Sequence, residues 1–585
     1  MLFPPPDVLA KADQSTAFIA LTWQELFDDE TPDTFQPRLL NVPSIVDELA
    51  SVARLACFAS VWEKHLQEIR DELKDLLSYS SSLLNAFPKY RWAIEHLVSL
   101  TSANDIERHA RILSDEYQSF DAFYVENLHR GIGEMPAAKE NLQIAIANLA
   151  SCAARSDRRR SSFTQLIREE SFSLSPAALA EMLCERTRTR VESFRFIAAV
   201  LGKQSDVQAI LRGTPGLQLL PEHSKPTGDL ADRFFSTYSG YSHVCGSVEA
   251  DDVSAAAKIA LREVGIVLDT FNFFRNRISL QAQNDLLILP EDGGKDIQLI
   301  NVHDESLGRL RPRRDARPLT QHTIQALLGN RLEGRLLNAL ELHALAHASF
   351  ASRVRLVNLW SALECLLPQT IKKSRVELLV ELVAPLLASR RVDKIVTYLA
   401  ISLHRYRTRY KRVLKYADGF ENSKRHVVRS TDLLHVLAKP SGHDHPKKLA
   451  DFASHHQLLR YRLFRAWSAL SRPSELRKEL IASERRVRWQ LYRIYRARNL
   501  SVHHGDNVPF VGPMLDCLQY YFSVTLTRVL EEMAHHAHWD VEDATASIAR
   551  KAAYLRDTLV DAPSRLLTED FIHLPDARAG ERLWP

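Results

Sequence analysis

The sequence has few cysteines, and no two of them have the close spacing of a metal-binding or redox pair. Six cysteines are scattered over 585 residues without a C-x-x-C pair, which suggests neither a disulfide framework nor a zinc knuckle. No stretch reaches the roughly 18 consecutive apolar residues of a membrane-spanning helix. The first residues also lack the basic and apolar regions of a secretory signal. We therefore expect reduced thiols and a cytoplasmic protein that makes no membrane contact.

Several catalytic sequence patterns are absent as well. The chain has no Gly-rich loop that could cradle phosphates and no G-x-S-x-G elbow, so ATPase and serine-hydrolase functions find no support. His343 and His347 have the i, i+4 spacing that can hold zinc, but no Glu follows His343 and no third ligand is apparent. We interpret them as core or interface histidines, and we predict no metal site and no cofactor.

The length and composition indicate a folded protein of several domains. A chain of 585 residues exceeds one ordinary core, which predicts two to four domains. Its 45% hydrophobic and 25% charged residues are typical of folded chains. The net charge is only +4. Any affinity for nucleic acid must therefore come from local basic patches.

The hydrophobic patterning divides the chain into helical units separated by a small mixed module. Apolar residues at spacings of three and four predict an α-helical domain of unknown role over residues 1–212, with a helical pattern that continues through 176–201. Residues 213–318 predict a small α+β module followed by a basic linker. Residues 345–560 return to helical patterns and predict a bundle. Residues 561–585 form a C-terminal tail. The fold class is thus mostly α.

Within the mixed module, three elements can be placed more closely. The segment 241–248 predicts a strand, and 252–274 predicts a helix. Segments 285–289 and 296–302 predict a hairpin across the Glu-Asp-Gly-Gly sequence between them.

A long basic helix precedes the most informative stretch of the sequence. From Pro473 onward the chain lacks Gly and further Pro until it reaches Arg498-Asn-Leu-Ser-Val-His-His-Gly505, so we expect a single helix there. Asn499 and His503 stand at i and i+4 and share a face. Arg496 lies on that face, while Arg498 is offset by about 140° but has a long side chain. The spacing leaves either arginine as the functional one.

This stretch resembles the R-x(4-6)-H motif of HEPN-domain ribonucleases. The spacing alone also occurs at Arg91/His96 and Arg528/His535, but neither match has Asn after the Arg or Val before the His. A second stretch, Trp360-Ser-Ala-Leu-Glu364, resembles the first helix of Apea-like HEPN proteins. The resemblance covers residues 345–560 and identifies that region as HEPN-like.

The resemblance implies a metal-independent endoribonuclease in which the RNA 2′-OH attacks the neighbouring phosphorus. His503 would move protons, and Arg498, with Arg496 as the alternative, would offset charge on the phosphate. Asn499 would orient the phosphate or the histidine. His504 could replace His503 in a longer register. Glu364 would support the site by family analogy, with a surface or core carboxylate as the alternative interpretation.

The resemblance also implies partners. One motif per chain implies a homodimer with a composite cleft. The arginines of the basic helix face would contact the RNA backbone, although a solvated face is the more common role of such a helix; they are Arg485, Arg486, Arg488 and Arg493. The N-terminal domains would sense a trigger molecule or phage protein and hold the nuclease silent, as in a toxin or an antiphage defence effector. The alternative is a catalytically inactive HEPN-like module that binds a partner protein or nucleotide, in which Arg498 and His503 merely complement a helix C-terminus.

Overall fold

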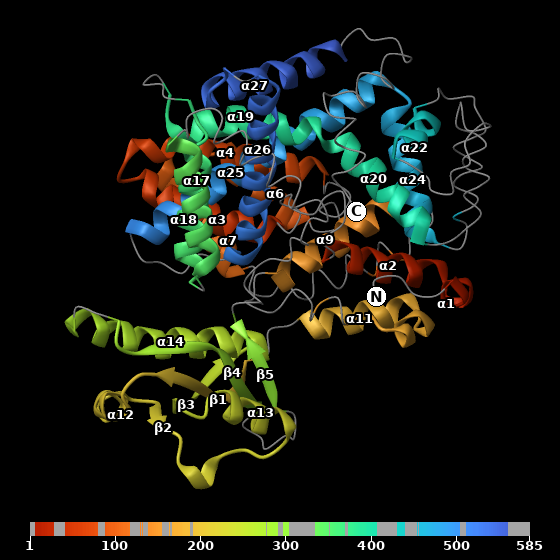
Figure 1. Cartoon of the computed structure of the whole chain (residues 1–585). Coiled ribbons are helices and arrows are strands. Elements are labelled where there is room, and N and C mark those ends of the chain that lie inside the picture. Colours follow the sequence, from red (N-terminus) through yellow and green to blue (C-terminus); the bar gives the residue numbers. More distant parts are fainter. Residues whose placement is uncertain are drawn as a thin grey trace.

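The computed structural model of the chain is mostly helical and contains a small antiparallel sheet (Figure 1). It confirms the predicted mostly α class with a small α+β module. The structure describes residues 6–27, 41–79, 88–116, 129, 132, 139–154, 163, 166–187, 191–275, 278–290, 297–302, 334–349, 351–368, 373–405, 430–438, 453, 456–503, 510–536 and 538–559. The predicted linker ending at residue 318 and the tail 561–585 lie outside them. Among the described helices, none is both long enough and apolar enough to cross a membrane.

Helices form most of the N-terminal part of the chain. Their bounds are α1 (Pro6–Lys11), α2 (Gln14–Leu26), α3 (Val42–Ala56), η1 (Ser60–Trp62), α4 (Glu63–Tyr79), α6 (Pro88–Ser99), α7 (Ala103–Glu116), α9 (Lys139–Ala154), η3 (Glu169–Ser173) and α11 (Pro176–Thr187). Side chains cap the starts of several of them: Asp13 accepts hydrogen bonds from the backbone of Ser15 and Thr16 at α2, and Asn41 accepts one from Ser44 at α3. Such caps satisfy backbone N–H groups that have no partner within the helix.

The sheet module holds five antiparallel strands in the order β2-β3-β1-β4-β5. Its elements are β1 (Glu192–Leu201), α12 (Gln204–Leu211), β2 (Leu217–Leu219), η4 (Glu222–Ser224), α13 (Asp229–Thr237), β3 (Ser242–Ala250), α14 (Val253–Arg275), β4 (Gln281–Pro290) and β5 (Gln298–Asn301). The predicted strand at 241–248, the helix at 252–274 and the hairpin are confirmed by β3, α14 and the β4–β5 pair. In Figure 1, α14 runs along the sheet.

The prediction of a helical pattern through residue 201 is wrong over Glu192–Leu201, because these residues form β1, the central strand of the sheet. Its residues alternate between two apolar environments. Phe196 packs in the core beneath α14, whereas Ile197 and Ala199 pack on the opposite face. A strand that is buried on both faces reads as a continuous apolar run, which periodicity alone does not distinguish from a buried helix. The sheet therefore begins before residue 213.

The C-terminal part of the chain is helical and uses two cores. Its helices are α17 (Gly334–Ala348), α18 (Ser352–Glu364), α19 (Arg375–Ser389), α20 (Arg391–Arg405), α22 (Ser430–Leu437), α24 (Gln457–Leu470), α25 (Pro473–His503), α26 (Val511–His535) and α27 (Val541–Thr558). Helices α17, α18, α19, α26 and α27 share one core with the second half of α25. Helices α20, α22 and α24 pack instead into the core of the N-terminal helices.

Helix α25 takes part in both cores. Its 31 residues span about 46 Å at 1.5 Å per residue, which is longer than one small core requires. Leu476 and Leu480 near its start are buried with the N-terminal helices, whereas Leu491 and Ile494 are buried with α18 and α26. The N-terminal helices and the C-terminal bundle are thus joined through one continuous helix.

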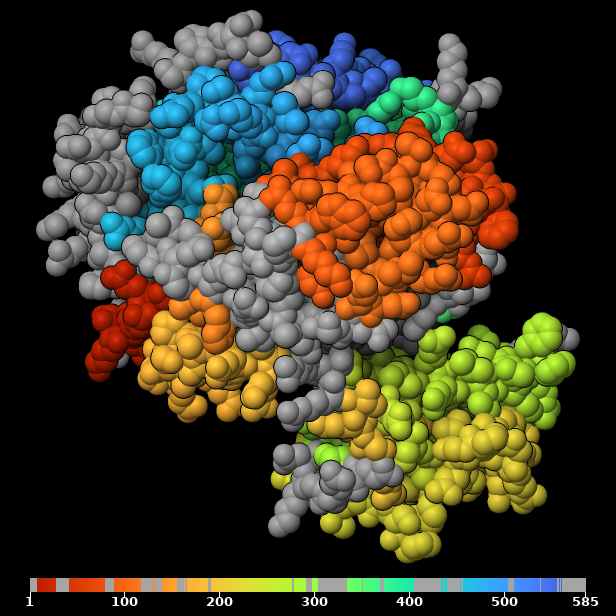
Figure 2. All heavy atoms as spheres, turned by 180° about the vertical axis from the view of Figure 1, so that it is seen from behind, coloured from red at the N-terminus to blue at the C-terminus, as the bar shows by residue number. Residues whose placement is uncertain are grey.

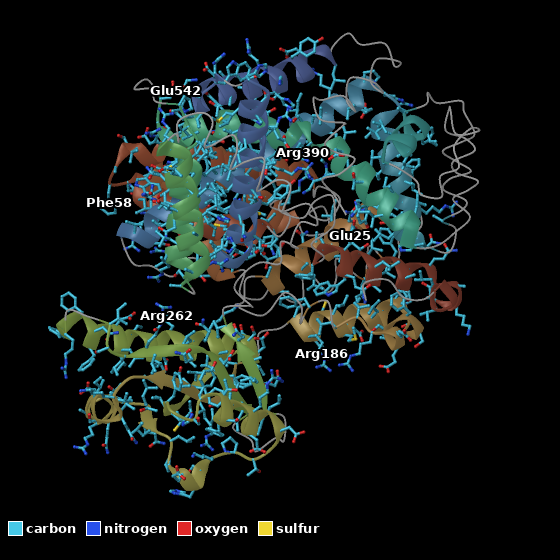
Figure 3. All side chains as sticks on the ribbon, viewed as in Figure 1. Glu25, Phe58, Arg186, Arg262, Arg390 and Glu542 are labelled. Carbon is cyan, nitrogen blue, oxygen red and sulfur yellow. The ribbon has the colours of Figure 1, made fainter. Side chains whose placement is uncertain are left out.

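Ion pairs connect segments that lie far apart in the sequence. Glu25 of α2, labelled in Figure 3, accepts a hydrogen bond of 2.6 Å from Arg462 of α24. Glu542 of α27, also labelled there, accepts one of 2.9 Å from Arg335 of α17. In Figure 2 the N-terminal helices, coloured red to orange, lie against the blue helices of the C-terminal part.

Candidate active site

The candidate site lies at the C-terminal end of α25. The predicted single helix is confirmed from Pro473 to His503, and its last turns pack beside α18 and α26. Arg498 and Asn499 are half-buried in the final turns. His503 is the last helical residue. The side chain of His503 and the whole of His504 lie outside the described residues.

Arg498 carries a guanidinium that no carboxylate of the described residues binds. Its Nη1 donates a hydrogen bond of 2.9 Å to Oδ1 of the adjacent Asn499. Its Nε is buried, and so is the hydroxyl of Ser501, and neither atom has a hydrogen-bond partner within the described part of the chain. Buried polar atoms are normally satisfied. The end of α25 therefore offers polar groups that could hold an anionic ligand.

Arg496, the alternative arginine of the motif, has a different environment. It is buried and donates from Nε to Oε1 of Glu48 on α3 at 3.0 Å. Arg493, one turn earlier, is buried as well and donates from Nε to the other oxygen of Glu48 at 2.8 Å. Arg493 also donates to Glu72 on α4. Both guanidinium groups are thus bound to carboxylates of the N-terminal helices.

The charges of this buried network shift the pKa values of its members. Burial alone would raise the pKa of Glu48, but the charges and hydrogen bonds of Arg493 and Arg496 outweigh it and lower this pKa to about 2. Burial raises the pKa of Glu72, which the charge of Arg493 only partly opposes. Burial and then the charge of Arg496 lower the pKa of His65, next to this network, to about 4. His65 is therefore neutral at pH 7, and Glu48 is ionised.

The arginines predicted to contact the RNA backbone are engaged within the chain. Arg485 forms an ion pair with Asp75, and Arg488 donates from Nε to Glu68 at 3.2 Å. Arg486 donates from Nε to the carbonyl of Ala482 and lies 3.9 Å from Glu479 within its own helix. Arg493 is bound as described above. Their contact with RNA remains a prediction.

The carboxylates that bind these arginines form a stripe that sequence reasoning missed. Glu68, Glu72 and Asp75 occur at i, i+4 and i+7 on α4, so they share one face of that helix. The spacing was visible in the sequence as an acidic helix face, which is usually solvated. Only the packing of α4 against α25 reveals that this face is directed at arginines.

Glu364 lies in the structure beside an aromatic cluster. Its Oε1 accepts a hydrogen bond of 2.7 Å from Nε1 of the buried Trp360. The Trp360 ring lies 5.7 Å from that of Tyr495 on α25, which in turn stacks on His65 at 5.5 Å. This contact favours the interpretation in which Glu364 satisfies a buried neighbour. It also shows that the Trp-Ser-Ala-Leu-Glu stretch packs against the motif helix.

Nothing among the described residues gathers three His, Cys, Asp or Glu side chains in a way that could hold a metal ion. Comparison of the chain with protein-family models, with curated proteins and with solved structures gave no significant match. The proposed function therefore rests on the residues at the end of α25.

Proposed function

We propose that the region 345–560 is a metal-independent endoribonuclease of the HEPN type, acting as a regulated toxin or antiphage defence effector. The observation that carries the proposal is the contrast between the two candidate arginines. Arg496 is neutralised by Glu48, whereas Arg498 has no carboxylate partner in the described chain and binds Asn499. Arg498 is thus the cation available for a phosphate near His503.

In the proposed reaction the RNA 2′-oxygen attacks the adjacent phosphorus and the bond from phosphorus to the 5′-oxygen breaks. The products are a 2′,3′-cyclic phosphate and a 5′-hydroxyl. The His503 imidazole takes the proton of the 2′-OH or returns a proton to the leaving oxygen. The guanidinium of Arg498 offsets charge on the non-bridging oxygens with parallel N–H donors. A second copy of the motif, from a partner chain, would complete the cleft, so the proposed enzyme is a homodimer.

The acidic stripe of α4 supports a restrained state of this enzyme. Arg485, Arg488 and Arg493 bind carboxylates in this structure, and RNA phosphates would compete for the same guanidinium groups. We infer that α3 and α4 occupy the RNA path until a trigger molecule or phage protein displaces them. In the restrained state, the carboxylates of the N-terminal helices would occupy the guanidinium groups that RNA phosphates would contact in the active state.

The proposal is tested by Arg498→Ala and His503→Ala in the purified full-length chain, with labelled RNA as substrate. Each change should lower the cleavage rate by about 100-fold or more, the usual contribution of a proton-transfer group or a charge-stabilising donor. Lys478→Ala is the matched control, because Lys478 is an exposed cation on the same helix and should leave the rate unchanged. Circular dichroism must show unchanged folding.

Wild-type cleavage by either variant would refute the site assignment. A chain whose cellular function survives both changes would be a HEPN-like binding module for a partner protein or nucleotide instead.

A further inference from the structure

Three polar side chains meet where α17 packs beside α26. Nε2 of His343 lies 3.0 Å from Nε2 of His347, one turn later on α17. The side-chain amide nitrogen of Gln519 on α26 lies 2.9 Å from the same His347 nitrogen. The ring of His343 also stacks on the buried Phe522 at 5.0 Å. The imidazole of His343 is thereby fixed in its orientation.

Hydrogen bonding alone does not satisfy this arrangement. A neutral ring nitrogen has either one N–H or one lone pair, so Nε2 of His347 cannot make two good bonds, to His343 and to Gln519, at once. The Gln519 amide can turn by 180° and place its oxygen where the nitrogen stands. In that orientation, and with the ring proton of each histidine on Nδ1, the Nε2 lone pair of His347 has a second ring lone pair at 3.0 Å and an amide oxygen at 2.9 Å. Lone pairs held this close together attract a cation.

We propose that His343 Nε2, His347 Nε2 and Gln519 Oε1 bind a divalent transition-metal ion. With metal–ligand bonds of about 2.05 Å, the 3.0 Å and 2.9 Å separations correspond to angles of about 94° and about 90° at the metal. These angles fit square-planar or octahedral Cu²⁺ or Ni²⁺ better than tetrahedral Zn²⁺. Both histidines are only half-buried, so water can complete the coordination. The inference is independent of the proposed nuclease.

The consequence of such a site is a link between two helices of the C-terminal core. His343 and His347 come from α17, whereas Gln519 is 172 residues after His347. An ion bound by all three stabilises the folded chain, because the unfolded chain does not hold these ligands together. The sequence shows the histidine pair but not the third ligand, since only tertiary packing brings the amide to it.

The test uses the full-length chain without an affinity tag, stripped by chelator and titrated with Ni²⁺ by calorimetry. The wild-type chain should bind one Ni²⁺ ion at a single site whose affinity exceeds that of any further Ni²⁺ site on the chain. His343→Phe, which retains a ring to stack on Phe522, and His347→Phe should each weaken this binding at least tenfold. Gln519→Leu should weaken it and Gln519→Glu should retain it, because a carboxylate also supplies an oxygen.

His109→Ala is the matched control, since His109 also lies beside a second histidine ring, His96, at 5.2 Å. This variant should bind Ni²⁺ as the wild type does, and Ni²⁺ should raise the melting temperature of both. Ni²⁺ should not raise the melting temperature of the His347→Phe chain. Equal Ni²⁺ affinity of the wild-type and His347→Phe chains would overturn the proposed metal site. RNA cleavage by the same samples reports separately on the proposed nuclease.

Discussion

Replacing Glu48 should destabilise the protein more than replacing any exposed acid of the same surface. Glu48 is the carboxylate that binds both Arg493 and Arg496, and its side chain is only 19% exposed. In the Glu48→Ala chain, Arg496 would remain buried without a carboxylate from the described residues. A buried charge that loses its partner is costly, because the surrounding protein replaces water poorly.

The general cost of breaking a buried ion pair and the pKa shift of Glu48 give a similar magnitude. Removing one partner of a buried ion pair costs about 3–5 kcal/mol. The pKa of Glu48 falls from 4.5 to about 2, and at about 1.4 kcal/mol per pKa unit the folded chain favours the ionised over the protonated carboxyl by roughly 3–4 kcal/mol. The loss expected for Glu48→Ala at pH 7 is therefore about 3–5 kcal/mol.

The pKa shift also fixes the pH dependence. Since the folded pKa of Glu48 is depressed, its stabilisation is present above pH 4.5 and is lost as the pH falls toward about 2. The contribution of Glu72 to the pH dependence has the opposite sign, because burial raises its pKa and the folded chain therefore favours its protonated form at low pH. The difference in unfolding free energy between the wild type and the Glu48→Ala chain should therefore shrink between pH 7 and pH 3.

The assay is urea unfolding followed by circular dichroism at both pH values. Asp75→Ala is the control: its partner Arg485 is half-exposed, so this loss should be at most about 1 kcal/mol. A double variant, Glu48→Ala with Arg496→Ala, should cost less than the sum of the two single changes, because the stranded guanidinium is gone. A Glu48→Ala loss no larger than that of Asp75→Ala would refute the argument.

Three further outcomes are expected. RNA cleavage should continue in excess EDTA and yield 2′,3′-cyclic phosphate; activity that disappears and returns with Mg²⁺ would point to metal-assisted chemistry. Reversing the acidic stripe with Glu68→Lys and Asp75→Lys should strengthen RNA binding, as measured by fluorescence anisotropy, with a steeper salt dependence; unchanged affinity would contradict the restrained state. When the Arg498→Ala and His503→Ala chains are mixed, heterodimers should recover partial activity if one copy of the motif supplies the arginine and the other the histidine. Full activity of a chain that light scattering shows to be strictly monomeric would exclude the composite site.

The helical elements were predictable because periodicity and breakers act locally. The absence of Gly and internal Pro predicted α25, and β-branched runs around Gly-rich turns predicted the β4–β5 hairpin. The strand β1 was not predictable, because an apolar run buried on both sheet faces has no distinctive period. The shared core of residues before 187 and after 391 was also invisible, since sequence periodicity indicates that a face is buried but not which partner covers it.

The sequence by itself determined which residue types stand at the end of α25 and how they are spaced along it. Asn499 and His503 share a helix face because 3.6 residues complete a turn. The tertiary structure decided which of the two arginines binds a carboxylate of the described residues. Arg496 and Arg498 are two positions apart and point in different directions, so α3 brings Glu48 to Arg496 and leaves Arg498 to Asn499. Helical spacing depends only on neighbouring residues. The net charge of a site also depends on carboxylates that lie far away in the sequence, such as Glu48, which is 448 positions before Arg496.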